Sequence, residues 1–238
     1  MRRAAAFLAA LLSLTAGEAA LAQAAAADAD NPTCPKSPGW STYRQMRFTR
    51  EVVNGRPVLR AEGAIDEGVA ERLKAALEEN PDIEEIWVRS SGGNARAGNE
   101  AGRIIREAMI PTRIPAGWAC FSACNFVFMG GVARFVDEGG VFMVHMFTHT
   151  GDRAAIKAEV AAGEDKAVEL IGAIEQESAL LASEDNDFLI RMGVSRKLLT
   201  EVMYRQKAVE GAGADRSTRR CLTQDELKRY NVATTLLS

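Results

Sequence analysis

Between residues 83 and 145, short apolar segments alternate with segments of helical character, and this alternation restricts the fold more than any other feature of the sequence. Apolar residues three or four apart predict helices, whereas short apolar runs bounded by glycine or proline predict buried strands. A chain of this kind forms an α/β fold with crossover connections. The predicted strands are 83–88, the segment between Pro111 and Pro115, 134–136 and 141–145, and the predicted helices are 95–108 and 122–129.

The segments on either side add a hairpin and further helices. Residues 46–53 and 58–62 read as two strands around Asn54-Gly55, a dipeptide that favours a two-residue hairpin turn. Asp66 can cap a helix whose apolar stripe includes Val69 and Leu73. Charged amphipathic helices are predicted at 153–182 with a break at Gly163, and then at 184–192, 195–204 and 223–230.

The N-terminus has the three parts of a secretory signal peptide. Arg2-Arg3 is basic, residues 4–16 are apolar but too short to cross a bilayer, and Ala20-Leu21-Ala22 offers a cleavage site. We therefore expect a signal peptide at 1–22, a flexible leader at 23–41 and one α/β domain at 42–238, in a periplasmic or secreted protein. An uncleaved membrane anchor is the alternative. No later segment is long and apolar enough to span a membrane.

Charge and cysteine content narrow the partners and the bridges. The net charge is −3 and no basic block stands out, which argues against nucleic acid as a partner. Four cysteines allow three pairings in an exported protein, and we favour Cys34–Cys221 because these two lie near the ends of the mature chain. Cys120 and Cys124, if both were in a regular helix, would hold their Cβ atoms too far apart for an unstrained bridge. A redox role for them is disfavoured.

Three motifs in chain order suggest nucleophilic catalysis. Ser122 stands at the start of an apolar helix, and His145 ends an apolar strand; His149, in a turn, is the only other histidine. A serine hydroxyl needs such a base to become a nucleophile. Gly92-Gly93 follows a strand and can present backbone amides to a substrate oxygen. Each motif also has a structural reading: an N-cap serine, a packed histidine and a strand-to-helix turn.

Metal, phosphate and cofactor sites have little support in the sequence. His145 and His149 have no glutamate between them and lie in predicted strand and turn, so we expect no metal. No lysine-serine or lysine-threonine pair follows Gly92-Gly93, which disfavours a phosphate loop. We expect no cofactor.

Together these motifs resemble those of the ClpP/crotonase superfamily, and most of all the proteolytic subunit of Clp protease and its exported periplasmic relatives. The resemblance covers about Val58 to Val232. It implies a single α/β domain built as a repeated β-β-α superhelix, with a long helix in its C-terminal half. The segments that carry it are Gly63-Ala64-Ile65-Asp66, residues 90–98, residues 117–123, Met143-Val144-His145, the helix at 153–182 and residues 221–232.

The resemblance also implies roles for individual residues. Ser122 would be the nucleophile and His145 the general base, with the amides of Gly92 or Gly93 and of Ala123 as the oxyanion hole. The sequence departs from the protease pattern at three points: Ser91 stands in place of a proline, Phe121 adds a residue before the serine, and no aspartate occurs where the acidic member should fall. Glu201 is the nearest acid there, and Asp215 is the fallback.

Three functions follow from this reading. The first is a secreted serine hydrolase, an endopeptidase that forms an acyl-enzyme with a peptide or protein substrate. The second is a catalytically silent binding or assembly module, in which the helix at 153–182 serves association into a homo-oligomer. The third, an acyl-CoA enzyme of crotonase type, is disfavoured by export and by the lack of a basic cluster.

Overall fold

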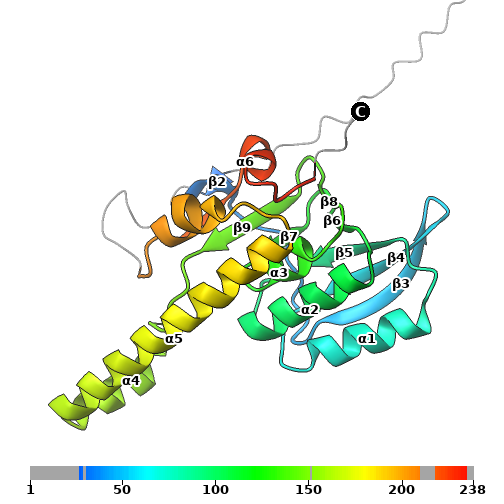
Figure 1. Cartoon of the computed structure of the whole chain (residues 1–238). Helices are drawn as coiled ribbons and strands as arrows, with labels where there is room; N and C mark the ends of the chain where they lie inside the picture. Colours follow the sequence, from blue (N-terminus) through cyan, green and yellow to red (C-terminus); the bar gives the residue numbers. More distant parts are fainter. Residues whose placement is uncertain (1–26, 29–30, 151, 210–217, 235–238) are drawn as a thin grey trace, which may run out of the picture.

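The fold described here comes from a computed structural model and covers residues 27–28, 31–150, 152–209 and 218–234. The predicted signal peptide at 1–22 and the fallback acid Asp215 lie outside these residues. Within them, strands form one five-stranded sheet, one three-stranded sheet and one two-stranded sheet, joined by helices (Figure 1). The expected α/β class is confirmed.

The five-stranded sheet has the order β3-β4-β5-β6-β8. β3 and β4 form the predicted antiparallel hairpin, and both turn residues have positive φ (52° at Asn54 and 81° at Gly55), as a two-residue turn of this kind requires. The other three strands run parallel to β4, because a helical segment crosses over before each of them. The strands are β3 (Arg47–Val53), β4 (Arg56–Glu62), β5 (Glu85–Arg89), β6 (Thr112–Ile114) and β8 (Arg134–Val136).

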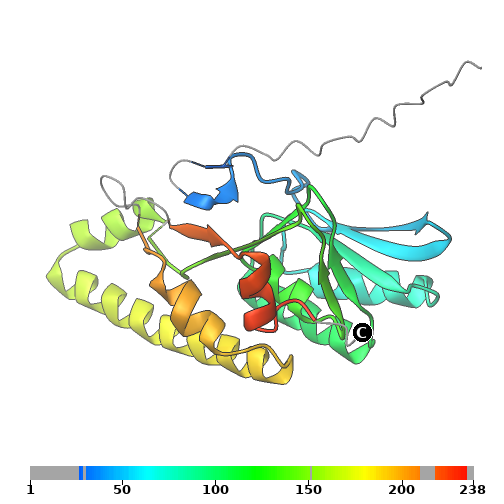
Figure 2. The same ribbon diagram turned by 90° about the horizontal axis from the view of Figure 1, so that it is seen from above.

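Helices α1 (Val69–Glu79) and α2 (Ala95–Glu107) lie on the same face of this sheet (Figures 1 and 2). β5 shows why: Ile86 and Val88 are fully buried on alternate positions and belong to the hydrophobic core that these helices close. The predicted helix over 95–108 is confirmed. Asp66, predicted to cap α1, does not occupy the cap position, which is Gly68; its carboxylate instead accepts the Gly68 amide and pairs with Arg72.

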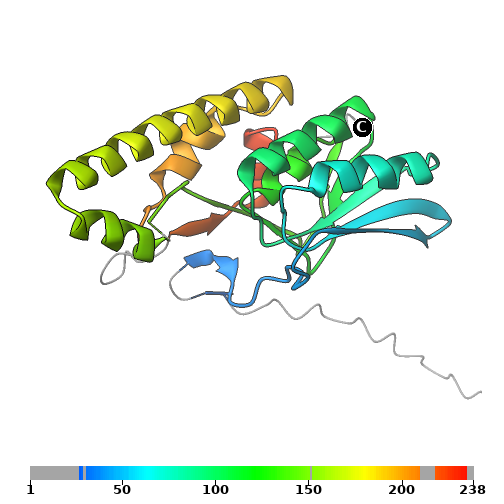
Figure 3. The same ribbon diagram turned by 90° about the horizontal axis from the view of Figure 1, so that it is seen from below.

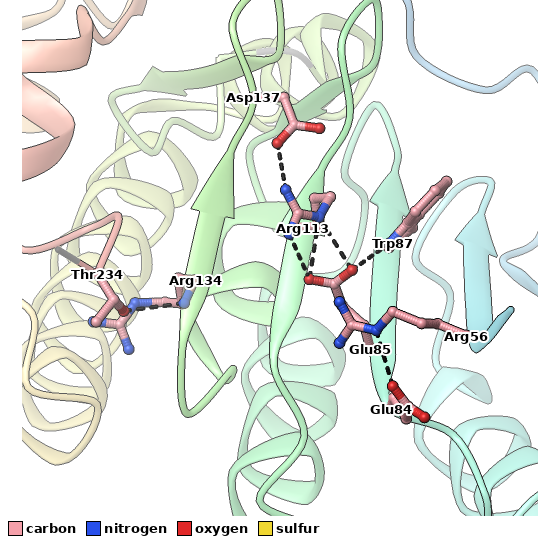
Figure 4. Close-up of polar contacts among 8 residues, drawn as sticks. All are labelled: Arg56, Glu84, Glu85, Trp87, Arg113, Arg134, Asp137 and Thr234. Atoms are coloured by element: carbon pink, nitrogen blue, oxygen red, sulfur yellow. Dashed lines mark hydrogen bonds and ion pairs between the residues drawn. The ribbon is translucent and has the colours of Figure 1, made fainter. Parts of the chain in front are cut away.

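The opposite face of the sheet carries a row of ion pairs (Figure 4). The buried carboxylate of Glu85 accepts hydrogen bonds from Trp87 Nε1 at 2.7 Å and from Arg113 Nε at 3.1 Å. Arg113 also pairs with Asp137, so its guanidinium links β5, β6 and the end of β8. Because both partners of the buried carboxylate are hydrogen-bonded to it, its desolvation is compensated.

The three-stranded sheet has the order β10-β9-β7 and carries the segment of interest. β9 is parallel to β7 and antiparallel to β10. The chain after β5 joins this sheet, because the Ser90 amide donates to Ala119 O and the Phe121 amide donates to Ser90 O. The two predicted strands at 134–136 and 141–145 both form, but in different sheets. The strands are β7 (Ala119–Phe121), β9 (Val141–His145) and β10 (Arg219–Cys221), and α3 (Cys124–Met129) follows β7.

Two helices, α4 (Arg153–Ala161) and α5 (Glu164–Arg191), form a hairpin that extends away from the sheets (Figures 1 and 3). The predicted break at Gly163 is confirmed, where φ is 123°. A separate helix at 184–192 was a wrong prediction, because α5 continues unbroken to Arg191. The remaining helical segments are the π-helical turn Leu198–Val202, the 3-10 turn Met203–Arg205 and α6 (Gln224–Arg229). No helix within the described ranges is long and apolar enough to cross a membrane.

Both cysteine pairs are bridged. Cys34, in β2 (Asn31–Pro35), is bonded to Cys221 in β10, which is the favoured pairing; β1 (Ala27–Asp28) pairs with β2. Cys120 is bonded to Cys124. The objection from helix geometry does not apply to this second pair, because Cys120 lies in a strand and the chain turns sharply before Cys124. The Cys120–Cys124 bridge therefore encloses the turn that contains Ser122.

The Cys34–Cys221 bridge should stabilise the protein strongly, because it connects residues 187 positions apart and so restricts the unfolded chain. We predict that Cys34→Ser combined with Cys221→Ser lowers the free energy of unfolding by about 2–4 kcal/mol in urea titrations. The wild type after reduction loses both bridges and should be destabilised at least as much. Free thiols at both positions in peptide maps of the oxidised protein would contradict the pairing.

Candidate active site

Ser122 occupies a strained turn between β7 and α3. Its φ is 58°, in the left-handed region that residues with a side chain seldom adopt. Such conformations cost free energy and persist where the surrounding structure enforces them, which occurs most often at functional sites. A serine on a sharp strand-to-helix turn presents its hydroxyl outward, the arrangement of a nucleophile elbow. Ser122 is also not the N-cap of α3, which is Ala123, so the N-cap reading of this serine fails.

Close backbone packing holds this turn in place. A methyl group on Gly92 would lie 2.7 Å from both Ser122 Cβ and Phe121 O, and one on Gly98 would lie 2.6 Å from Ala123 O. No real side chain tolerates contacts this short, so both positions require glycine. The segment after β5 and the first turn of α2 therefore press directly on the Ser122 turn, and this packing is what sustains its unusual φ.

His145, the last residue of β9, lies against the serine. Its Nε2 atom is 2.7 Å from Ser122 Oγ, the distance of a hydrogen bond between a serine and its general base. Backbone contacts fix the strand at this point, since Met143 O accepts the Asn125 side-chain amide at 2.9 Å and the Ser122 amide at 3.4 Å. The Phe121 ring covers the imidazole, with ring centroids 4.8 Å apart. The two residues are thus held in contact by rigid elements.

The surroundings of His145 favour the neutral imidazole. Burial lowers its pKa below the ordinary 6.5, and a hydrogen bond with the Met146 backbone acts in the opposite direction. A neutral ring can accept the serine proton, whereas an imidazolium cannot. At neutral pH, His145 is therefore mainly in the neutral form that can act as a base.

Two backbone amides beside Ser122 are free to bind an anion. Gly93 and Ile65 form a parallel β-bridge, in which the Ile65 amide donates to Gly92 O and the Asn94 amide donates to Ile65 O. The N–H of Gly93 itself therefore points to the other side. Gly93 also lines the same pocket as Ser122. Within the described residues, neither the Gly93 amide nor the Ala123 amide has a hydrogen-bond partner. The Gly92 amide differs, because it donates to Ser90 Oγ at 3.0 Å. Of the two glycines proposed for an oxyanion hole, the geometry leaves Gly93.

Glu201, proposed as the acidic member, lies elsewhere. Its carboxylate accepts the Tyr230 hydroxyl at 3.1 Å and pairs with Lys197 at 3.4 Å, and these contacts lower its pKa. No carboxylate in the described part of the chain forms an ion pair with His145. The partners of the Glu201 carboxylate are thus Lys197, one turn earlier, and Tyr230, after α6, and its described contacts do not include the histidine.

A pocket of about 230 Å³ opens beside Ser122 and His145. Its walls are mostly apolar, but Asp185 of α5 and Tyr204 also line it. The sequence reasoning missed both residues. The signal was an acid on an apolar helix face, because Asp185 is flanked at helical spacing by the buried residues Leu181, Phe188 and Leu189. A larger open hollow of about 790 Å³ lies by β3 and α1, where Asp66 and Arg72 already pair with each other.

The remaining candidates do not join the site. His149 lies 3.9 Å from Glu177 on α5 and packs edge-on against Phe147, so it contacts the helical hairpin rather than Ser122. Among the residues that the structure describes, no group of three or more histidine, cysteine or acidic side chains is arranged to hold a metal ion.

Among known proteins, similarity to this chain is found in solved structures. No family model matches the chain, and no curated protein matches it in sequence. Solved structures similar to it include ClpP1 from Listeria monocytogenes, with a TM-score of 0.47 and 16% identity over 74% of this chain and 88% of that one. A mutant of the same ClpP1 gives a TM-score of 0.49 and 17% identity over the same shares.

A mutant of the membrane-bound stomatin-specific protease 1510-N is also similar, with a TM-score of 0.45 and 14% identity over 74% of this chain and 75% of that one. These likenesses are distant, so the functional argument rests on the geometry around Ser122 and His145.

Proposed function

We propose that the protein is an exported serine peptidase that acts through an acyl-enzyme at Ser122. The observation that carries this proposal is the 2.7 Å contact between Ser122 Oγ and His145 Nε2 at a turn with left-handed backbone. A packed structural serine has no need of that backbone strain, whereas a nucleophile gains an exposed hydroxyl from it. Export is supported by the signal-like N-terminus and by two disulfides, which persist in oxidising compartments.

The reaction would proceed in two steps, acylation of Ser122 and hydrolysis of the resulting ester. Ser122 Oγ attacks the carbonyl carbon of the scissile peptide bond while its proton passes to His145 Nε2. The resulting oxyanion accepts hydrogen bonds from the amides of Gly93 and Ala123. His145 returns the proton to the leaving nitrogen as the C–N bond breaks, which leaves an ester on Ser122. Water then attacks the ester, with His145 as base, and the acid product leaves with Ser122 Oγ protonated again.

The catalytic unit in this proposal is a dyad. In a triad the acid fixes the imidazole tautomer and stabilises the imidazolium. Here the Met146 backbone acts in the same direction as an acid would, because its contact raises the pKa of His145. It carries no full negative charge, so it stabilises the imidazolium less well. We therefore expect turnover slower than that of a complete triad.

The nucleophile can be tested with a fluorophosphonate probe, which reacts only with activated serines. The wild type should be labelled and Ser122→Ala should not. His145→Ala should react at least about 100-fold more slowly than the wild type, because a general base usually contributes that much to the rate. Glu201→Gln is the matched control and should react like the wild type, because this carboxylate contacts Tyr230 and Lys197 instead.

Absence of labelling in a folded wild type would contradict the peptidase proposal. It would favour the second candidate, a silent binding module on the same fold. The lack of an acidic partner for His145 among the described residues also favours that candidate.

The pH dependence of labelling should report the base. The imidazolium form cannot accept a proton, so the rate should rise with pH and level off above the pKa of His145, with a midpoint below 6.5 because burial lowers that pKa. Asp185, whose pKa is raised to about 7, is the second group titrating in the pocket. The midpoint should therefore persist in Asp185→Asn. A midpoint above neutral pH in both proteins would contradict a buried neutral histidine as base.

A further inference from the structure

We propose that the pocket beside Ser122 binds a basic side chain of the substrate, with Asp185 as the acceptor of its ammonium group and the Tyr204 hydroxyl beside it. This inference rests on the proposed peptidase function, because it names the substrate class of the same site. It places a lysine-type residue next to the scissile bond. Neither residue takes part in the bond-breaking steps described above.

Asp185 is an acid in a buried position, where an unpaired carboxylate does not stabilise the fold. Its residue is 5% exposed, and it lies on the α5 face that packs on the body of the protein. Its Oδ1 atom is buried and has no hydrogen-bond partner within the described ranges. A buried carboxylate oxygen left unpaired is costly, and such groups in native proteins call for an explanation. A ligand that donates to it is one.

Tyr204 repeats this pattern from another element. Its side chain comes from the 3-10 turn Met203–Arg205, and its hydroxyl is buried without a partner among the described residues. Burial, and then the charge of Asp185, raise the pKa of this hydroxyl to about 12, so the two groups are close enough to interact. Two unpaired polar groups from separate elements thus converge on one cavity, the pattern of a specificity pocket.

The charge around Asp185 selects a cation. Among the residues that the structure describes, no lysine or arginine lines the cavity, and the titratable groups that line it are His145, Asp185 and Tyr204. Burial, followed by the charge of the neighbouring Glu184, raises the pKa of Asp185 to about 7. An entering ammonium group would oppose both effects and restore the ionised carboxylate. Arg96, which pairs with Glu184, contacts the outer side of α5 and leaves Asp185 unpaired.

The rest of the cavity suits the methylene stem of a lysine. Its walls include four large apolar side chains. Long basic side chains bury their stems along such surfaces while the charged end finds a polar partner. The volume of about 230 Å³ accommodates one side chain rather than a larger ligand. These four residues are Phe126, Phe147, Leu181 and Met203.

The inference can be tested by binding, without turnover. Two fluorescent peptides that differ only in lysine or norleucine before the scissile bond are titrated against full-length Ser122→Ala at pH 8.5, where Asp185 is ionised. Norleucine has the same stem without the ammonium group. We expect the lysine peptide to bind at least about tenfold more tightly, the effect of one charge-assisted hydrogen bond. Equal binding, tighter binding of norleucine, or no measurable binding of either peptide would overturn the proposal.

Variants then assign the effect. Asp185→Asn in the same background should bring the lysine-to-norleucine ratio close to one, and Tyr204→Phe should reduce it several-fold. Glu184→Gln removes the adjacent acid that faces Arg96 and should keep the preference. A preference that survives Asp185→Asn would overturn the role of this residue. If Asp185→Asn fails to fold, the ratio in the Ser122→Ala protein and the Tyr204→Phe result still decide.

Failure of the two proposals can be told apart. Fluorophosphonate labelling of Ser122 without a lysine preference would leave the hydrolase standing and remove the pocket assignment. A lysine preference in binding without labelling would leave the pocket standing and remove the peptidase.

Discussion

The site depends on a close backbone contact between the Ser122 turn and the glycines that press on it. Gly92 and Gly98 bring two segments so near that added methyl groups would lie 2.7 Å from Ser122 Cβ and 2.6 Å from Ala123 O. This contact holds Ser122 at φ 58° and directs its hydroxyl to His145. The same approach places Gly93 on the wall of the pocket. The Cys120–Cys124 bridge closes the turn from the other side. The strained backbone of Ser122 is thus held by contacts that involve both sheets and helix α2.

Burial gives His145 and Asp185, two titratable side chains of the pocket, different roles. It lowers the pKa of His145, which keeps the base neutral, and it raises the pKa of Asp185 to about 7. Groups whose environments shift their pKa values in this way are typical of functional sites. His145 has a partner in Ser122, whereas Asp185 Oδ1 has none among the described residues. His145 can therefore accept the proton of Ser122, and Asp185 can accept a hydrogen bond from a ligand.

The sequence predicted local structure well where local chemistry determines it. The Asn54-Gly55 hairpin, the strand at 141–145 and the break at Gly163 depend on turn residues and short apolar runs, and all three form as expected. The continuation of α5 was missed because tertiary packing overrides a weak local signal. Ser183 donates to Ala179 O at 2.9 Å within the helix, and the buried Phe188 and Leu189 hold it against the body.

The site was predictable in part for the same reason. His145 and the glycine segment lie at the ends of predicted strands, and Ser122 lies at the start of a predicted helix. The short strand β7, which pairs with β9 and brings Ser122 beside His145, was not predicted. Glu201 could not be assessed from the sequence, since its partner Tyr230 comes from a distant segment. Asp185 and Tyr204 meet only through the docking of α5, which no local pattern encodes.

The most direct test of the central claim is to trap the acyl-enzyme. A short peptide ester with lysine at the cleaved position is mixed with the wild type, the reaction is quenched in acid within the first turnover, and the digest is analysed by mass spectrometry. Our account predicts one added acyl group on the peptide that contains Ser122. Turnover of the ester with no adduct, or an adduct on a different residue, would contradict it.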